Sequence, residues 1–158
     1  MFYAGKLLSH LNVLPPDEQS ALISLLSINR NAAVLIDSDR YQGKPGGKKP
    51  RMRLNETKRR IKEEIEATQG FVWVTEGREV ENYTPIEVYA RAVGKVAPEV
   101  DQYEQIVELP LLAECKGNKV ALAHKVAPLT NLEDLKGHLD LWMRLDLLCH
   151  QIRRWNGN

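Results

Sequence analysis

Two aspartates, Asp37 and Asp39, follow directly after a short apolar run at positions 32–36. A run of this length without a polar residue is typical of a strand that is buried on both faces of a parallel sheet. Ligands bind at the carboxyl ends of such strands, and two carboxylates one residue apart can share a divalent cation such as Mg²⁺. The same pattern occurs in phosphotransfer domains, in sugar-nucleotide transferases and in aspartates that cap an ordinary turn. Taken alone, the pair leaves a metal site and a plain turn equally open.

A second acidic cluster follows the next apolar run, at positions 71–75. Glu76, Glu79 and Glu81 all lie within eight residues of its end. Two carboxylate clusters on adjacent strand ends repel each other unless a cation lies between them. Two-metal phosphodiester chemistry uses such an arrangement, with metals about 4 Å apart that stabilise the attacking and leaving oxygens. A solvated acidic loop is the alternative interpretation.

A basic segment begins next to the aspartate pair. Positions 40–62 hold ten bases and one acid, a net charge of +9, and the rest of the chain carries −8, so the total is only +1. Positions 41–50, rich in Gly, Lys and Pro, predict an exposed and mobile loop. Charge runs are usually just solvated, but this position beside the carboxylates favours a salt-dependent contact with a nucleic-acid backbone. The bases that we expect to make it are Arg40, Lys44, Lys48, Lys49, Arg51 and Arg53.

Helical and strand-like segments alternate around these clusters. Positions 17–28 carry apolar residues at helical spacing, and the strand predicted at 32–36 follows. A second helix is predicted over 55–69, with Gly70 as its C-terminal stop. The second strand is predicted at 71–75. This order of elements predicts an α/β fold with a small parallel sheet flanked by helices.

The second half of the chain is predicted to be mainly helical. Thr84-Pro85-Ile86-Glu87 reads as a capping box for a helix that ends near Gly94. Weak signals over 95–117 predict mostly loop with one short helix, and a further helix is predicted over 118–127. A capping box at Thr130 predicts a last helix that reaches about Trp155. An apolar stripe on this last helix is interpreted as packing surface: Leu132, Leu135, Leu139, Met143, Leu147 and Ile152.

The composition excludes several classes of protein. With 158 residues, 43% of them hydrophobic and 27% charged, the chain can bury a core without disulfides or metals. No apolar run of about 18 residues is present, which argues against a membrane protein. Cys115 and Cys149 lie far apart and predict buried, reduced thiols in a cytoplasmic protein, not a disulfide framework. The four histidines fall on separate predicted elements without zinc spacing, so zinc is not expected.

These motifs carry a resemblance to a known family. Two motifs separated by a predicted helix resemble the Toprim domain of the OLD (overcoming lysogenization defect) family nucleases. They are Ala-Val-Leu-Ile-Asp-Ser-Asp-Arg at 33–40 and Thr-Glu-Gly-Arg-Glu-Val-Glu-Asn-Tyr at 75–83. Those proteins join an ATPase to a Toprim nuclease, and several act in phage defence. Positions 2–11 and 118–123 are similar to two further family segments. The resemblance implies a Toprim-like Rossmannoid three-layer fold over 1–127, and a C-terminal helix at 128–158 that packs on it or on a partner.

The resemblance assigns roles to the acidic residues and to one lysine. It implies that Asp37 and Asp39 are ligands of Mg²⁺ or Mn²⁺ in a two-metal site. Glu81, together with Glu79, would hold or orient the second metal and take part in catalysis. Lys119 corresponds to the family's catalytic lysine, which would stabilise charge on the scissile phosphate; an ordinary surface lysine is the alternative.

Two arginines have a less specific role. Arg40 and Arg78 lie next to the acidic motifs, so the resemblance implies that they contact phosphate. Their alternative role is to balance the charge of the neighbouring carboxylates.

Two features of the family have no counterpart in this chain. No residue matches the glutamate that ends the family's first Toprim strand, and positions 43–49 do not meet the Gly-x₄-Gly-Lys-Ser/Thr pattern of an ATP site. We therefore expect an N-terminally truncated Toprim domain, the C-terminal part of a longer ATPase–nuclease. The missing part would come from a preceding segment or an ATPase-bearing partner chain, and a homodimer is a further option.

The favoured function is accordingly metal-dependent hydrolysis of DNA phosphodiesters by an endonuclease that acts in DNA processing or phage defence. The alternative is a non-catalytic remnant that binds DNA or a partner, because the first glutamate is missing. A phosphotransfer or nucleotide-sugar domain that uses Asp37 is a weaker third option, since nothing resembles its other motifs.

Overall fold

The computed structural model describes residues 11–12, 23–24, 31–43, 47–115 and 118–157. The chain divides into two compact units. The first contains the residues up to Ile36 together with Arg53–Val74 and Leu145–Asn158, and the second contains Asp37–Met52 and Thr75–Arg144. The predicted division into 1–127 and 128–158 stays a prediction.

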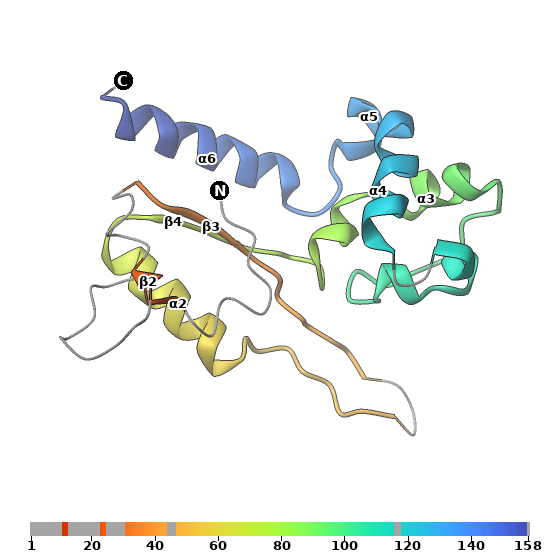
Figure 1. Ribbon diagram of the computed structural model, residues 1–158, viewed down its shortest axis with the longest axis horizontal. Helices are drawn as coiled ribbons and strands as arrows, with labels where there is room; N and C mark the ends of the chain where they lie inside the picture. Colours follow the sequence, from red (N-terminus) through yellow and green to blue (C-terminus); the bar gives the residue numbers. More distant parts are fainter. Residues whose placement is uncertain (1–10, 13–22, 25–30, 44–46, 116–117, 158) are drawn as a thin grey trace. The chain divides into compact units, whose positions relative to one another are not determined.

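The longer of the two strand pairs described in the first unit is a parallel pair, β3 (Ala33–Ile36) and β4 (Phe71–Val74) (Figure 1). Ala33 pairs with Phe71 and Ile36 with Val74, so both strands end at the same level of the sheet. Both predicted strands and their parallel pairing are confirmed, with bounds within one residue of those expected. The chain continues from these two ends into the second unit, at Asp37 and Thr75.

Helix α2 (Glu56–Ala67) confirms the helix predicted between the two strands. Its N-cap is Asn55, whose Oδ1 accepts a hydrogen bond from the backbone N–H of Lys58 at 2.9 Å. Ile61 and Ile65, one turn apart, are both fully buried. They pack with Val34, Ile36, Val72 and Val74 of the strands, so an apolar stripe of the helix covers the sheet.

The end of α2 differs in detail from the predicted glycine stop. The residue in the left-handed conformation is Gln69, with a φ of 61°. Gly70 comes next, and its N–H donates to the carbonyl of Ile65 at 3.0 Å. A Cβ at Gly70 would lie 2.5 Å from Cγ2 of Ile65. Glycine is therefore required there for close approach of the chain to the helix and not for its φ.

The helix predicted over 17–28 is wrong at Ile23–Ser24. These two residues form strand β2, which pairs in parallel with β1 (Leu11–Asn12). Backbone groups that pair with a neighbouring strand cannot also form hydrogen bonds along a helix. The rest of the predicted helix, and the segment at 2–10 that resembles the OLD family, lie outside the described residues.

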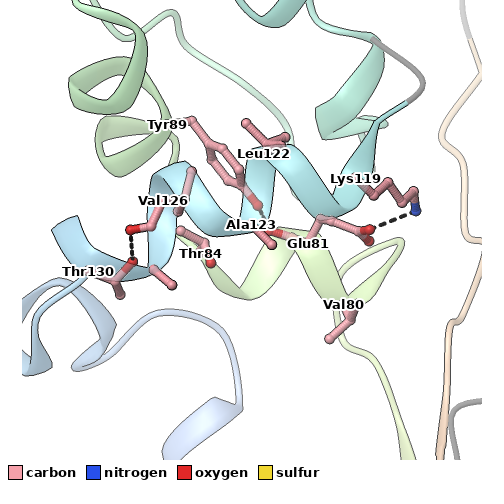
Figure 2. Close-up of a pocket in the computed structure, with 10 residues that line it drawn as sticks. Val80, Glu81, Thr84, Tyr89, Lys119, Leu122, Ala123, Val126 and Thr130 are labelled. Carbon is pink, nitrogen blue, oxygen red and sulfur yellow. Dashed lines mark hydrogen bonds and ion pairs between the residues drawn. The ribbon is translucent and has the colours of Figure 1, made fainter. Parts of the chain in front are cut away.

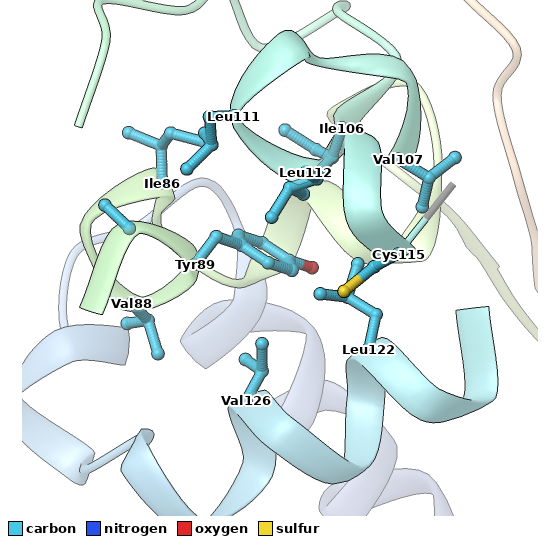
Figure 3. Close-up of a cluster of buried hydrophobic side chains, with 11 residues drawn as sticks. Ile86, Val88, Tyr89, Ile106, Val107, Leu111, Leu112, Cys115, Leu122 and Val126 are labelled. Carbon is cyan, nitrogen blue, oxygen red and sulfur yellow. The ribbon is translucent and has the colours of Figure 1, made fainter. Parts of the chain in front are cut away.

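The core of the second unit lies among helices α3 (Ile86–Val93) and α4 (Lys119–Val126) and the short 3₁₀ helices η3 (Ile106–Glu108) and η4 (Pro110–Cys115). Figure 3 shows the ring of Tyr89 surrounded by apolar side chains from these elements. Leu112 and Leu122 are almost completely buried beside it. This core supports α4, so it fixes the position of Lys119 at the start of that helix.

The starts of the helices follow the predictions only in part. The predicted helix at 118–127 is confirmed as α4, and Asn118 caps it by accepting from the N–H of Ala121 at 2.9 Å. Helix α3 ends at Gly94 in the left-handed conformation, as predicted. Its predicted capping box is wrong: the N-cap is Pro85, and no side chain caps the helix. Thr84 is extended there, and the short helix that precedes it uses a different cap pair.

The predicted last helix is two helices, α5 (Leu132–Leu135) and α6 (Leu141–Trp155). Gly137 and Leu139 both have positive φ, which a right-handed helix cannot contain. The capping box that starts α5 is Asn131 with Asp134, one residue later than predicted. The interpretation of the apolar stripe as packing surface also fails in part, because four of its residues are 43–54% exposed: Leu132, Met143, Leu147 and Ile152.

The chain is thus a mixed α/β protein with a small two-strand parallel sheet flanked by helices. The Toprim-like three-layer arrangement stays a prediction. Among the described residues no helix is both long enough and apolar enough to span a bilayer.

The contact of α2 with the sheet predicts a graded loss of stability. Ile65→Ala should lower the free energy of unfolding by about 2–5 kcal/mol, because it removes buried methyl groups and leaves a cavity. Ile65→Val should cost only about 0.5–1.5 kcal/mol. Urea unfolding followed by circular dichroism measures both values. Equal and small losses for the two variants would contradict the packing described here.

Candidate functional site

The two segments that leave the strands are joined to each other within the second unit. The backbone N–H of Asp39 donates to the carbonyl of Arg78 at 2.9 Å. The N–H of Ser38 donates to Oγ1 of Thr75 at 2.8 Å. The Asp37–Asp39 segment and the Thr75–Arg78 segment therefore lie side by side, as the parallel sheet led us to expect.

Two buried hydroxyl groups hold this junction together. Ser38 is 1% exposed and Thr75 is fully buried. Oγ of Ser38 donates to the carbonyl of Gly77 at 2.6 Å and accepts from the N–H of Arg40 at 3.2 Å. Glycine at position 77 also lets the chain pass close to Asn82, because a Cβ there would lie 2.7 Å from Cβ of Asn82. Neutral hydrogen bonds therefore set the course of both acidic segments.

The two aspartates take different positions in this arrangement. Oδ1 of Asp37 accepts from the N–H of Val80 at 2.9 Å, at the start of the 3₁₀ helix η2 (Val80–Tyr83). Asp39 has a φ of 51°, a left-handed conformation that Asp tolerates better than most residues. Its backbone carbonyl accepts from Nη2 of Arg51 at 2.9 Å. Asp37 thus lies against the second acidic segment, and Asp39 lies at the start of the basic loop.

Lys119 brings the other predicted residues together. Its Nζ lies 3.0 Å from Oε2 of Glu79. The same Nζ lies 2.7 Å from Oε1 of Glu81, and Figure 2 shows this second pair. The two glutamates are largely buried, with side chains 11% and 15% exposed, whereas the lysine side chain is 45% exposed. Asn82 holds the start of η2 by accepting from the N–H of Glu79 at 2.8 Å. Residues about forty positions apart in the chain therefore form one ion-paired cluster.

The electrostatics of the cluster keep Lys119 protonated. Partial burial lowers the pKa of Lys119, but its hydrogen bonds to Glu81 and Glu79 outweigh that effect, so the pKa is raised above its ordinary value. Beside it, burial raises the pKa of Tyr89 to about 12. The hydroxyl of Tyr89 donates to the backbone carbonyl of Glu81 at 2.9 Å. Near neutral pH the site therefore holds an ammonium ion and a neutral phenol.

The residues suit Mg²⁺ or Mn²⁺ in donor type but do not form a complete set of ligands. Oε2 of Glu81 is buried and has no hydrogen-bond partner among the described residues. Such an oxygen is free to bind a hard cation. Across the described part of the chain, however, no three His, Cys, Asp or Glu side chains gather in a group that could hold a metal. A metal at Glu79 and Glu81 would have to compete with the ammonium of Lys119.

The residues predicted to contact nucleic acid differ in their exposure and in their partners. Arg78 is turned inward: its Nη2 donates to Oε1 of Gln105 at 3.2 Å, and its guanidinium lies 5.7 Å from the ring centre of Tyr41. Its Nε lies 3.7 Å from Oε1 of Glu79. Arg78 therefore lies beside a carboxylate, with its side chain 21% exposed, and its contact with phosphate stays a prediction.

The basic loop itself is closed at its base. Tyr41 and Arg51 form an antiparallel bridge with two backbone hydrogen bonds of 2.8 and 2.7 Å. Arg51, Lys48 and Lys49 are exposed, and Arg40 is half-buried. Arg53 is exposed but belongs to the first unit, and Lys44 lies outside the described residues. Of the predicted bases that the structure describes, Arg51, Lys48 and Lys49 are thus both exposed and in the same unit as the acidic cluster.

Reasoning from the sequence missed three residues of this site. Ser38 and Thr75 were passed over because hydroxyl residues inside acidic motifs carry no distinct chemical signal. Tyr89 was read only as part of a helix. The one clue was position, since Ser38 separates two aspartates and Thr75 ends an apolar run.

The comparisons with known proteins are negative. No protein-family model, no curated protein and no solved structure matches this chain.

The buried hydroxyl of Thr75 predicts a specific loss of stability. Thr75→Val keeps the shape of the side chain but leaves the N–H of Ser38 without its acceptor. The free energy of unfolding should fall by about 1–3 kcal/mol, the cost of an unsatisfied buried polar group. Thr57→Val, at a half-buried position of α2, is the matched control and should change stability far less. Equal effects of the two variants in urea unfolding would show that the hydroxyl does not join the segments.

The raised pKa of Lys119 predicts low chemical reactivity. Acylating reagents attack the neutral amine, and each unit by which the pKa rises cuts the neutral fraction about tenfold. At pH 9, Lys119 should therefore react more slowly than the exposed Lys48 and Lys49, as measured by peptide mapping after brief acylation. Glu81→Gln removes one ion-pair partner and should raise the reactivity of Lys119 but not of Lys48. Fast labelling of Lys119 in the unaltered protein would contradict the ion pairs.

Proposed function

We propose that this chain is a Toprim-type domain that cleaves DNA phosphodiesters with Mg²⁺ or Mn²⁺. The single observation that supports the proposal most is the double ion pair of Lys119 with Glu79 and Glu81. The resemblance to OLD-family nucleases points to the same lysine and the same two glutamates, and the contact brings the three together from two separate segments of the chain.

The proposed roles follow from the surroundings of each side chain. Asp37, Asp39 and Glu81 would hold the metal, and Glu81 offers its unpartnered Oε2. Glu79 is flanked by Lys119 and Arg78, so its main role is to balance charge and orient the lysine. A bound metal ion supplies a Lewis acid and lowers the pKa of a bound water.

Lys119 has the second role in this proposal. Its exposed, permanently charged ammonium would bind a phosphate oxygen and stabilise the charge that develops on it during cleavage. To do so it must exchange a hydrogen bond with Glu79 or Glu81 for one with the phosphate. The exposed bases Lys48, Lys49 and Arg51 would hold the DNA backbone farther along, through contacts that weaken with salt.

The biological setting is part of the proposal. DNA is the substrate, and the ATPase and the first Toprim glutamate would come from a preceding segment or a partner chain. Such an assembly would act in DNA processing or phage defence, in the cytoplasm.

A second function is favoured by a specific observation: the described residues contain no assembled group of three metal-binding side chains. In that case the domain would bind DNA or a partner without cleaving it. The basic loop would supply the DNA contact, and the cluster around Lys119 would be structural.

A plasmid-nicking assay distinguishes metal-dependent cleavage of DNA from binding without cleavage. With Mn²⁺ or Mg²⁺ the protein should nick supercoiled plasmid, and excess EDTA should abolish the activity. Glu81→Gln and Lys119→Met should each lower the nicking rate by about a hundredfold or more, as the loss of one group that stabilises the transition state typically does.

Glu133 and Lys136 provide matched controls, since they form an exposed ion pair with a 2.6 Å separation elsewhere in the same unit. Glu133→Gln and Lys136→Met should nick at the normal rate. Nicking that survives in Glu81→Gln would disprove the proposed site. DNA binding without any metal-dependent nicking would support the second function.

A further inference from the structure

A cavity of about 500 Å³ opens beside the ion pair of Lys119 and Glu81. Figure 2 shows this pair at one end of the cavity and Thr130 toward the other, with one side of α4 between them. All the residues that line it belong to the second unit. The volume lies within the range of about 300–1,000 Å³ that is typical of sites for small molecules.

The cavity divides into a charged end and a neutral body. Among its lining residues only Glu81 and Lys119 carry a charge, and they lie together. The body is lined by apolar groups of Leu122, Ala123 and Val126. Such a site suits a ligand with an uncharged body attached to a charged group, and under the proposed function that group is the phosphate that Lys119 binds.

Three hydroxyl groups in the lining add polar contacts to the neutral body. They belong to Thr84, Tyr89 and Thr130. The hydroxyl of Tyr89 stays protonated at neutral pH, because burial raises its pKa to about 12. Thr130 donates to the carbonyl of Val126 at 3.0 Å, which leaves its oxygen able to accept. A flat, mainly apolar ring with polar atoms on its edge matches this lining better than a purely aliphatic group does.

We infer that this cavity binds the base of the nucleotide whose phosphate lies at Lys119. A nucleobase is a neutral ring with a polar edge, and the sugar joins it to an anionic phosphate. Enzymes that do chemistry on a base take it out of its stack into a pocket of this kind, which shows that a protein pocket can hold an unpaired base. The inference rests on the proposed function and adds to it a substrate class: a nucleotide that is unpaired at the site of cleavage.

The inference assigns a role to Ala123. This residue lines the cavity from α4, and its side-chain position is open to solvent. A phenylalanine at this position would fill the body of the cavity and leave Lys119 and Glu81 in place. Val120 lies on the same helix, is 68% exposed and does not line the cavity. Ala123→Phe and Val120→Phe are therefore a matched pair of variants.

The test uses two probes that differ only in the base. Deoxyadenosine 5′-monophosphate carries it, and 2-deoxyribose 5-phosphate does not. Neither probe contains a phosphodiester, so neither is cleaved. Each is titrated in Mg²⁺ into the full chain, and binding is followed through backbone amide NMR shifts, including those of Ala123 and Ala127. The unaltered protein should bind the nucleotide about tenfold more tightly than the sugar phosphate.

Ala123→Phe should remove this preference, and Val120→Phe should retain it. If circular dichroism shows that Ala123→Phe does not fold, Ala127→Phe takes its place, since Ala127 also lines the cavity and is exposed. Equal binding of the two probes, no binding of either, or a preference that survives Ala123→Phe would overturn the inference. The plasmid-nicking assay tests the proposed function separately from this binding assay. Failure of the base-binding inference and failure of the proposed function can therefore be told apart.

Discussion

The structure of the second unit depends on how two carboxylates are kept together away from water. The side chains of Glu79 and Glu81 are largely buried, two residues apart, and would repel each other if they had no partner. Burial of a charge is costly unless the charge is paired and hydrogen-bonded. Lys119 meets this requirement for both glutamates at once. The position of α4 follows from that contact together with the apolar core around Tyr89.

In this site, neutral side chains hold the backbone of the two acidic segments, and other side chains carry the charge. Ser38 and Thr75 are buried and neutral, and they hold the two acidic segments side by side through hydrogen bonds. Several carboxylates also have structural contacts: Asp37 accepts from the N–H of Val80, and the side chain of Glu79 takes part in the cap of η2. Neutral hydrogen bonds suit the buried junction because they need no counter-charge. The result is a rigid base that presents acids and one lysine along a shared edge.

The cavity lies beside the ion pair because both are built on helix α4. Helix α4 contributes Lys119 to the ion pair at its first residue and small or apolar side chains to the cavity along the rest of its length. Tyr89 joins the two regions, since its ring lies in the core and its hydroxyl reaches the backbone of Glu81. The ion pair, the cavity and the core therefore all include residues of α4.

Local signals in the sequence determined much of this molecule. Strands β3 and β4 and helices α2 and α4 lie close to where apolar runs and periodicity predict them. The predictions failed where a single residue decides the outcome: Leu139 takes a left-handed conformation and divides the last helix, and Pro85 replaces Thr84 as a cap. The helix predicted at residues 23–24 is wrong for another reason: the pairing of β2 with β1 overrides the helical spacing of apolar residues.

The sequence by itself determined which residue types are available for chemistry and in which order they follow the strands. The tertiary structure alone decided that Lys119 meets Glu79 and Glu81, that Arg78 turns inward toward Tyr41, and that a cavity opens beside the ion pair. The physical reason is that these contacts join residues about forty positions apart, and their energies depend on burial and distance. Neither burial nor distance can be read from the spacing of residues along the chain.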